Sequence, residues 1–206
     1  MLDQMTVGQS PWRRLEGAVV TVVLLLGMSL PGIAEQPDRL SAILLVARPK
    51  LADPNFAESV VLVMNNLGPA PVGIIVNRPT RVSVSHLFPE NPRIARLPER
   101  IYFGGPVDVG RVWFLFRAPM PPAHSVRAFD DFYLSGDREL LIKLLARDKP
   151  MDGLRIFLGY SGWAPGQLEA EIERGDWTSQ RADKDAIFDR KLERAWPSEG
   201  EPSTGT

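Results

Sequence analysis

The stretch GYSGWAPGQLEAEIERGDW, residues 159–177, decides the fold of this 206-residue chain, because a strand ends in it and a helix follows within a few residues. The stretch contains four glycines, whose backbone is unusually free, and one proline, whose backbone is restricted. These turn residues are Gly159, Gly162, Pro165, Gly166 and Gly175. Pro165 fits the first helical position because its missing N–H would have no partner there. Gly175 fits the left-handed position that ends a helix. We therefore interpret this set as structural.

The side chains of the same stretch also favour a structural role. Leu168 and Ile172 share one helical face, and we expect Trp163 and Trp177 to pack against the two ends of the helix. Glu169, Glu171 and Glu173 occupy helix positions outside this apolar face. Glutamate is seldom fully buried without a partner, so we expect these three to form a solvated face.

Outward from this stretch, the chain consists of short apolar runs typical of strands. We expect strands at residues 40–48, 59–65, 71–78, 101–107, 111–118, 125–135, 153–162 and 176–182. Residues 83–88 predict a short helix, and the leucine spacing of residues 137–147 predicts a longer one. Strand runs with a few short flanking helices indicate a single α+β domain with a mixed, mostly antiparallel sheet.

The N-terminus differs from the rest of the chain. Arg13 and Arg14 precede an apolar run at residues 17–30, and Gly32 and Ala34 have the small-x-small spacing of a cleavage site. We therefore predict a signal peptide at residues 1–34, a domain at 35–197 and a disordered tail at 198–206, with a periplasmic or secreted product. Two alternatives stay open: residues 17–34 form an uncleaved membrane anchor, or translation starts at Met28 and the protein is cytoplasmic.

Composition restricts the classes of function. The formal net charge is −1 and the sequence pI is about 6.2, so there is no basic excess for binding nucleic acid. The chain has no cysteine, which excludes disulfides, thiolate nucleophiles and cysteine metal sites.

Few residues fit a catalytic or metal-binding pattern. The two histidines, His86 and His124, are not near a G-x-S-x-G elbow. Asp130 and Asp131 are neighbours in a predicted strand, so their side chains would point to opposite faces. The segment DKDAIFD, residues 183–189, lacks the third ligand and the glycine of an EF-hand. We assign no catalytic residue, no metal ligand and no cofactor.

Two turns remain as a candidate ligand site. Asn77 and Arg78 end an apolar strand before a proline, and an arginine beside an amide can clamp a carboxylate. Gly104 and Gly105, in the turn GGPV, offer backbone N–H groups. The same Asn and Arg side chains also tie down loops by bonding backbone carbonyls, and we favour this structural role.

Four motifs in this order, DPNFAESVVLV, VGIIVNRP, IYFGGPV and GYSGWAPGQLEAEIERGDW, resemble the YqgE/AlgH family. The resemblance covers roughly residues 40–196. It implies an α+β domain of about this size and no established catalytic residues. Some members carry the label of transcriptional regulator, which the chain supports poorly, because it shows no recognition-helix pattern and no basic face.

These observations favour an exported, non-enzymatic binding or accessory module of the cell envelope. Its partner would be an envelope protein or a small ligand, with membrane contact only if residues 17–34 stay uncleaved. The competing hypothesis is a hydrolase with a pocket between the NRP turn at Asn77–Pro79 and the GGPV turn at Gly104–Val107. A convergent cleft with two perturbed carboxylates would favour the enzyme, and an apolar patch would favour the module.

Overall fold

The computed structural model describes residues 42–64, 67, 69–182 and 186–188, and all of them belong to one compact unit. The predicted signal peptide at 1–34 and the predicted tail at 198–206 lie outside the described residues, as do Asp183 and Asp189 of the DKDAIFD segment.

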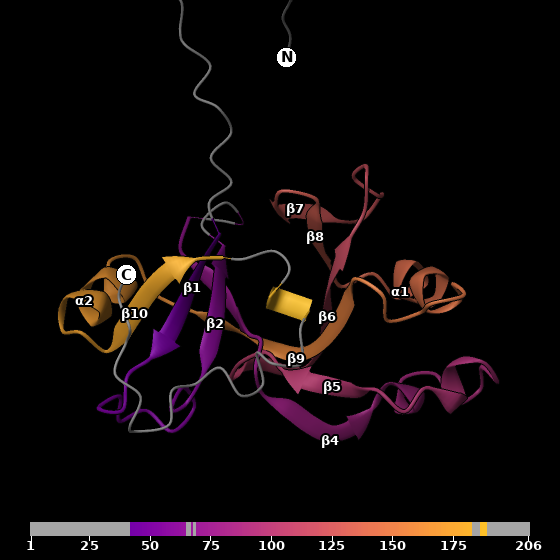
Figure 1. The fold of residues 1–206 in the computed structure, drawn as a ribbon, viewed down its shortest axis with the longest axis horizontal. Helices are drawn as coiled ribbons and strands as arrows, with labels where there is room; N and C mark the ends of the chain where they lie inside the picture. Colours follow the sequence, from indigo (N-terminus) through magenta and orange to yellow (C-terminus); the bar gives the residue numbers. More distant parts are fainter. Residues whose placement is uncertain (1–41, 65–66, 68, 183–185, 189–206) are drawn as a thin grey trace, which may run out of the picture. The chain divides into compact units, whose positions relative to one another are not determined.

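One curled sheet organises the described domain (Figure 1). Its strands are β1 (Ala42–Ala47), β2 (Val60–Met64), β3 (Val72–Ile75), β4 (Pro79–Ser83), β5 (Arg100–Phe103), β6 (Val107–Arg117), β7 (Val126–Phe129), β8 (Phe132–Ser135), β9 (Leu154–Gly162) and β10 (Trp177–Arg181). Their order is β10–β1–β2–β3–β9–β6–β8–β7, with β5 beside β9 and β4 beside β5. Only the β5–β9 pair is parallel among the described pairs. The predicted α+β class with a mixed, mostly antiparallel sheet is confirmed.

Strand β9 joins the two halves of the sheet, of which one contains β10, β1, β2 and β3 and the other contains β6, β8 and β7. Along one edge it pairs with β6 over most of its length. Along the other edge Phe157 and Leu158 pair with β5, and then Ser161 and Gly162 pair with β3. The first part of the stretch at 159–177 therefore lies where both halves meet.

Two α-helices cover the sheet: α1 (Arg138–Leu145) and α2 (Gln167–Glu173). Shorter 3-10 turns occur at Val84–His86, Ile94–Arg96 and Ala186–Phe188. The Asp137 side chain caps α1 by accepting a hydrogen bond from the backbone N–H of Leu140, which confirms the predicted helix. Among the described residues, no helix is long and apolar enough to cross a bilayer.

The ends of α2 agree only in part with the sequence prediction. Pro165 is not the first helical residue, because Gly166 adopts a left-handed φ of 78° and the helix begins after it. At the other end, Gly175 has a φ of 73°, and its N–H donates to the carbonyl of Ile172 while the Asp176 N–H donates to that of Glu171. This pair of bonds is the Schellman motif, so the predicted helix end at Gly175 is confirmed.

The core forms on both faces of the curled sheet. On the inner face, the two halves of the sheet contact each other through Leu44, Val60, Leu62, Ile74, Leu115, Phe132, Leu134 and Phe157. On the outer face, α2 packs on β1 and β2 through Leu168, and α1 packs on β6, β8 and β9 through Leu141 and Leu145. Figure 1 shows α2 beside β10 and α1 beyond β6. Alternation along each strand sends successive apolar side chains to these opposite faces.

Two predicted strands were wrong: the one at 101–107 ends at Phe103, with Val107 already in β6, and the one at 125–135 is divided. Residues 125–135 form two strands, β7 and β8, joined by a tight turn at Asp130 and Asp131. Asp130 adopts a positive φ of 40°, which aspartate tolerates better than most residues. The two carboxylates therefore do not occupy opposite faces of a continuous strand, and Asp131 instead binds Nε of Arg117 at 3.0 Å.

Candidate functional site

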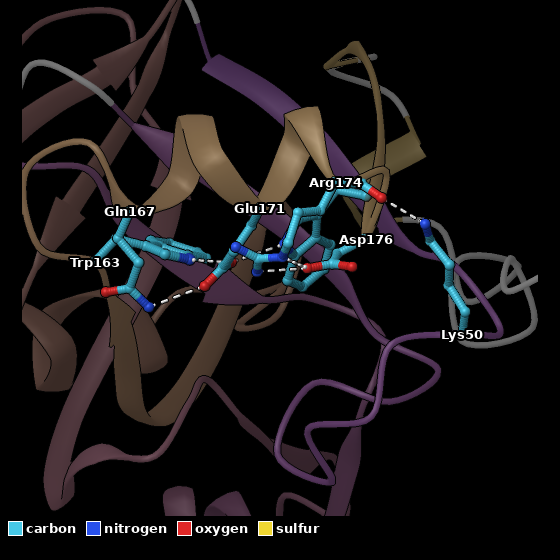
Figure 2. A network of polar contacts seen from close by, with 7 residues as sticks. Lys50, Trp163, Gln167, Glu171, Arg174 and Asp176 are labelled. Carbon is cyan, nitrogen blue, oxygen red and sulfur yellow. Dashed lines mark hydrogen bonds and ion pairs between the residues drawn. The ribbon is translucent and has the colours of Figure 1, made fainter.

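Glu171 forms the centre of a polar network at α2 (Figure 2). Its Oε2 atom accepts hydrogen bonds from the indole Nε1 of Trp163 at 2.9 Å and of Trp177 at 3.0 Å. Its Oε1 atom accepts from Nε2 of Gln167 at 2.9 Å. A carboxylate that satisfies two indole donors fastens the helix to the rings below it.

This network corrects the predicted solvated face. Glu169 and Glu173 are exposed as expected, but Glu171 is half-buried and hydrogen-bonded. The sequence pattern missed the difference because the two donors are tryptophans six and eight residues from Glu171, outside its own helical turn.

The two tryptophans themselves confirm the packing prediction. Trp163 is 5% exposed and Trp177 is 3% exposed, and both pack with Leu168 in the cluster under α2. Phe56 stacks on Trp163 with ring centroids 6.0 Å apart and meets the edge of Trp177 at 5.7 Å. At the C-terminal end of the helix, Arg174 pairs with Asp176 (Figure 2). These contacts hold α2 against the sheet.

Asn77 is committed to the backbone. It is 8% exposed, its Oδ1 accepts the N–H of Val60 at 2.8 Å, and its Nδ2 donates to the carbonyl of Glu58 at 3.0 Å. These bonds attach the end of β3 to the loop that precedes β2. Both the oxygen and the nitrogen of the side-chain amide therefore form hydrogen bonds within the fold.

Arg78 is committed in the same way. Its two terminal nitrogens donate to the carbonyls of Asn55 at 2.8 Å and Ala57 at 2.6 Å, and its guanidinium lies 5.6 Å from the ring centre of Phe103. Burial lowers the pKa of Arg78 from its ordinary value, and the Glu58 carboxylate raises it in part. The geometry matches the loop-tying role that the sequence analysis favoured.

Gly104 and Gly105 follow β5 at a point where the chain closely approaches the backbone of β9. A Cβ atom on Gly104 would lie 2.3 Å from the carbonyl oxygen of Gly159, and one on Gly105 would lie 2.3 Å from that of Tyr160. The Gly104 N–H already donates to the carbonyl of Leu158 at 2.8 Å. Close backbone approach therefore explains both glycines.

The predicted NRP and GGPV turns are brought together by the structure, since the N–H of Phe103 donates to the carbonyl of Arg78. Asn77, Arg78, Gly104 and Gly105 line neither of the two hollows described below, whereas Pro79 of the NRP turn lines the second of them.

The two histidines lie apart from each other. His86 is exposed, and its Nδ1 lies 2.9 Å from the hydroxyl oxygen of Ser83, which also contacts the Ser85 hydroxyl. The three-residue spacing of Ser83 and His86 could have revealed this contact in the sequence. Within the described residues no carboxylate bonds His86, so the third member of a hydrolytic triad is missing. His124 is exposed, and its carbonyl accepts the Ser135 hydroxyl.

The inner face of the sheet contains a hollow of about 730 Å³, here called the Trp113 hollow. Its lining residues come from β3, β6, β7, β8, β9 and the loop after β2, and they are Leu67, Val72, Ile74, Asp108, Arg111, Trp113, Val126, Arg127, Leu134 and Tyr160. Ile74 and Leu134 belong to the inner core, so the hollow is continuous with buried apolar surface. A hollow of this size fits a drug-sized molecule.

Trp113 gives this hollow its most distinctive feature. Its indole Nε1 is buried and has no hydrogen-bond partner. Arg111 lies over the ring, with Cζ 4.5 Å from the ring centre, and Tyr160 meets it edge to face at 6.3 Å. The sequence analysis read residues 111–118 only as a strand, although alternation places Arg111 and Trp113 on one face.

A second hollow of about 610 Å³, the Glu99 hollow, is lined by Pro79, Pro98, Glu99, Arg100, Tyr102, Met151, Leu154, Arg155 and Phe188. Arg155 is 4% exposed and lies 4.4 Å from the ring centre of Tyr102, and its Nη1 donates to the carbonyl of Val76 at 2.9 Å. Oε2 of Glu99 is buried without a hydrogen-bond partner. Across the part of the chain that the structure describes, no group of three or more His, Cys, Asp or Glu side chains could hold a metal ion.

Known proteins are similar to this chain in sequence and in fold. The family profile described as AlgH-like, DUF179, matches residues 44–200. A UPF0301 protein of Anaeromyxobacter dehalogenans strain 2CP-C is 36% identical over 172 residues, which cover 79% of this chain and 87% of that protein. A UPF0301 protein of Jannaschia is 33% identical over 175 residues, which cover 82% and 89% respectively.

Two solved structures are similar in fold. The solution structure of the AlgH protein from Pseudomonas aeruginosa has a TM-score of 0.64 and 29% identity, and the match covers 77% of this chain and 88% of that one. A crystal structure of a Corynebacterium diphtheriae protein has a TM-score of 0.56 and 27% identity, with 72% and 79% covered. Together with the profile match and the curated relatives, these similarities show that the chain belongs to the AlgH-like DUF179 family, also called UPF0301 or YqgE/AlgH.

Proposed function

We propose that this protein is a non-enzymatic binding module, exported to the cell envelope, that holds a small molecule in the Trp113 hollow. The observation that carries the proposal is that Trp113, which lines a largely apolar hollow, has a buried Nε1 atom without a hydrogen-bond partner. Leaving a buried donor unpaired costs about 1–3 kcal/mol, and most such groups in folded proteins are paired. A ligand with an acceptor atom would remove this cost.

The lining favours binding over chemistry. Among its described residues there is no serine, cysteine or histidine, and Asp108 is the only carboxylate. Nucleophilic catalysis needs an activated nucleophile with a base in reach, and general acid–base catalysis needs a positioned proton donor or acceptor. An apolar wall with a few polar groups is instead typical of a site that orients a ligand.

The export part of the proposal is supported by the sequence. The arginine pair at Arg13 and Arg14, the apolar run at 17–30 and the small residues Gly32 and Ala34 have the order of a signal peptide. Intact-mass measurement on protein recovered from the envelope fraction of producing cells tests it. We expect a chain that starts at Glu35. A mass that includes residues before Glu35 contradicts cleavage, and recovery from the cytosol alone contradicts export.

Ligand retention tests the binding part. The protein is recovered under native conditions, and molecules released by organic solvent are identified by mass spectrometry. Val126→Trp places a large ring at the Trp113 hollow, where Val126 is 51% exposed. Val82→Trp is the matched control, since Val82 is also exposed, at 39%, and does not line the hollow.

We expect the wild-type protein and Val82→Trp to release the same small molecule in amounts comparable to the protein. Val126→Trp should release at least tenfold less while its circular dichroism spectrum stays native. Equal retention by Val126→Trp would place the bound molecule elsewhere. A wild-type protein that retains nothing, and whose melting temperature is not raised by an extract of the envelope fraction, would refute the binding function.

A further inference from the structure

We infer that the ligand of the Trp113 hollow is an apolar molecule that ends in a carboxylate, an inference that rests on the proposed binding function. Four features of the hollow carry it: its unpaired donor, a nearby cation, the balance of charge on its lining, and its apolar walls.

The donor and the cation belong to two residues of β6, Trp113 and Arg111, that both line the hollow. An indole N–H donates and cannot accept, so the Nε1 atom of Trp113 requires an acceptor. Arg111 lies on the face of the same ring, 4.5 Å from its centre, and no ion pair to Arg111 occurs within the described part of the chain. A carboxylate has two oxygens, one for the indole and one for the guanidinium. Hydrogen bonds to ionised groups are about twice as strong as neutral ones.

The charges that line the hollow favour an anion. Two arginines, Arg111 and Arg127, and one carboxylate, Asp108, contribute a formal charge of +1. Arg127 donates from Nη2 to the Tyr133 hydroxyl at 3.3 Å and lies 5.8 Å from that ring centre, so part of its guanidinium is engaged within the fold. Asp108 repels an anion, so the carboxylate is expected to bind near the arginines and away from Asp108.

Other head groups fit less well. An ammonium group could approach Asp108, but it has no lone pair for Nε1 of Trp113, so the buried donor would stay unpaired. A phosphate monoester carries more charge and more acceptor oxygens than the indole and Arg111 can satisfy, and burying unpaired acceptors is costly.

The rest of the ligand is expected to be apolar. Val72, Ile74, Val126 and Leu134 form walls that continue into the inner core. Apolar area removed from water contributes roughly 25 cal/mol per Å². A short aryl or alkyl chain in this volume would supply the attraction, and the carboxylate would fix its orientation.

The test uses three probes with one phenylbutyl skeleton: 4-phenylbutyrate, 4-phenylbutyramide and 4-phenylbutylamine. Their affinities for the mature protein are measured by calorimetry and by ligand-observed NMR at an ionic strength of about 0.15 M, where the Debye length is about 8 Å. We expect the carboxylate to bind at least tenfold more tightly than the amide and the amine to bind most weakly. Arg111→Gln should bring the carboxylate affinity down to that of the amide, because it removes the cation while keeping hydrogen-bond donors.

Two further variants locate the effect. Trp113→Phe keeps an aromatic ring and removes the N–H donor, so it should weaken both the carboxylate and the amide by several-fold. Arg81→Gln is the control for net charge, because Arg81 is exposed on β4 and does not line the hollow. It should leave all three affinities within about twofold, since a distant exposed charge is screened.

The outcomes separate the two proposals. An amide that binds as tightly as the carboxylate overturns the carboxylate inference and leaves small-molecule binding intact. Tightest binding by the amine also overturns it and points to Asp108. If none of the probes binds at millimolar concentration, the inference is wrong, and the ligand-retention experiment then decides on the binding function alone.

Discussion

Replacing Glu171 with alanine is the most direct test of the network at α2. The change removes the acceptor shared by the indole nitrogens of Trp163 and Trp177 and leaves both rings in place. Glu173→Ala is the matched control: it alters the same residue type in the same helix, and Glu173 is exposed.

The magnitude follows from the bonds that are lost. A hydrogen bond to a charged group contributes about 1.5–3 kcal/mol, and a buried donor left unpaired costs about 1–3 kcal/mol. Two indole donors are affected, whereas the third donor, Gln167, is exposed and can bond water instead. Because Glu171 is half-buried, water can replace part of the lost bonding. We expect the free energy of unfolding to fall by about 2–4 kcal/mol.

Urea unfolding followed by circular dichroism measures this change. With a slope of about 2 kcal/mol per molar urea, the midpoint should fall by about 1–2 M, whereas Glu173→Ala should stay within about 0.5 kcal/mol of wild type. Glu171→Gln keeps a neutral acceptor and should lie between the two. If Glu171→Ala matches Glu173→Ala, the carboxylate is solvated and the structural reading of the network is refuted.

Three further predictions concern stability by the same measurement. Asn77→Ala should lower the free energy of unfolding by about 2 kcal/mol, because the N–H of Val60 loses its buried acceptor; a loss below about 0.5 kcal/mol would contradict this role. Gly104→Ala should cost at least about 1–3 kcal/mol from steric overlap, while Gly110→Ala, with open space around its Cβ, should be neutral or slightly stabilising, and equal effects would disprove the close-approach argument. Trp113→Phe should stay within about 1 kcal/mol of wild type in the absence of ligand, because lost packing is offset by removal of an unpaired donor, and a loss above about 3 kcal/mol would assign Trp113 to the core instead.

The elements that the sequence predicts well are those whose periodicity is local. β1 and β2 follow directly from apolar runs, and α1 follows from leucines at helical spacing. The hairpin at Asp130 was missed because its turn has two residues and contains neither glycine nor asparagine, so the apolar pattern continues across it. Gly162 was grouped with the turn residues, yet it ends β9 without a positive φ.

The candidate site was harder to predict than the fold, because its contacts join distant segments. The role of Arg78 depends on carbonyls more than twenty residues earlier, at Asn55 and Ala57. The Trp113 hollow depends on the curl of the sheet, which brings β3 opposite β6 and β8. Residue spacing within one strand contains no information on such pairings, so Arg111 and Trp113 looked like ordinary strand residues.

The buried indole nitrogens of Trp113, Trp163 and Trp177 show why we propose a function for the hollow rather than for residues 159–177. At α2, Trp163 and Trp177 are almost fully buried, and Glu171 accepts a hydrogen bond from each of them. At the hollow, the N–H of Trp113 is equally removed from water and has no acceptor. Pairing at the first place accounts for a cluster that resembled a site in the sequence, because every donor finds a partner inside the fold. The unpaired N–H of Trp113 destabilises the fold, and Trp113 lines a hollow next to the cation of Arg111. A ligand with an acceptor atom that reached this N–H would remove the destabilisation.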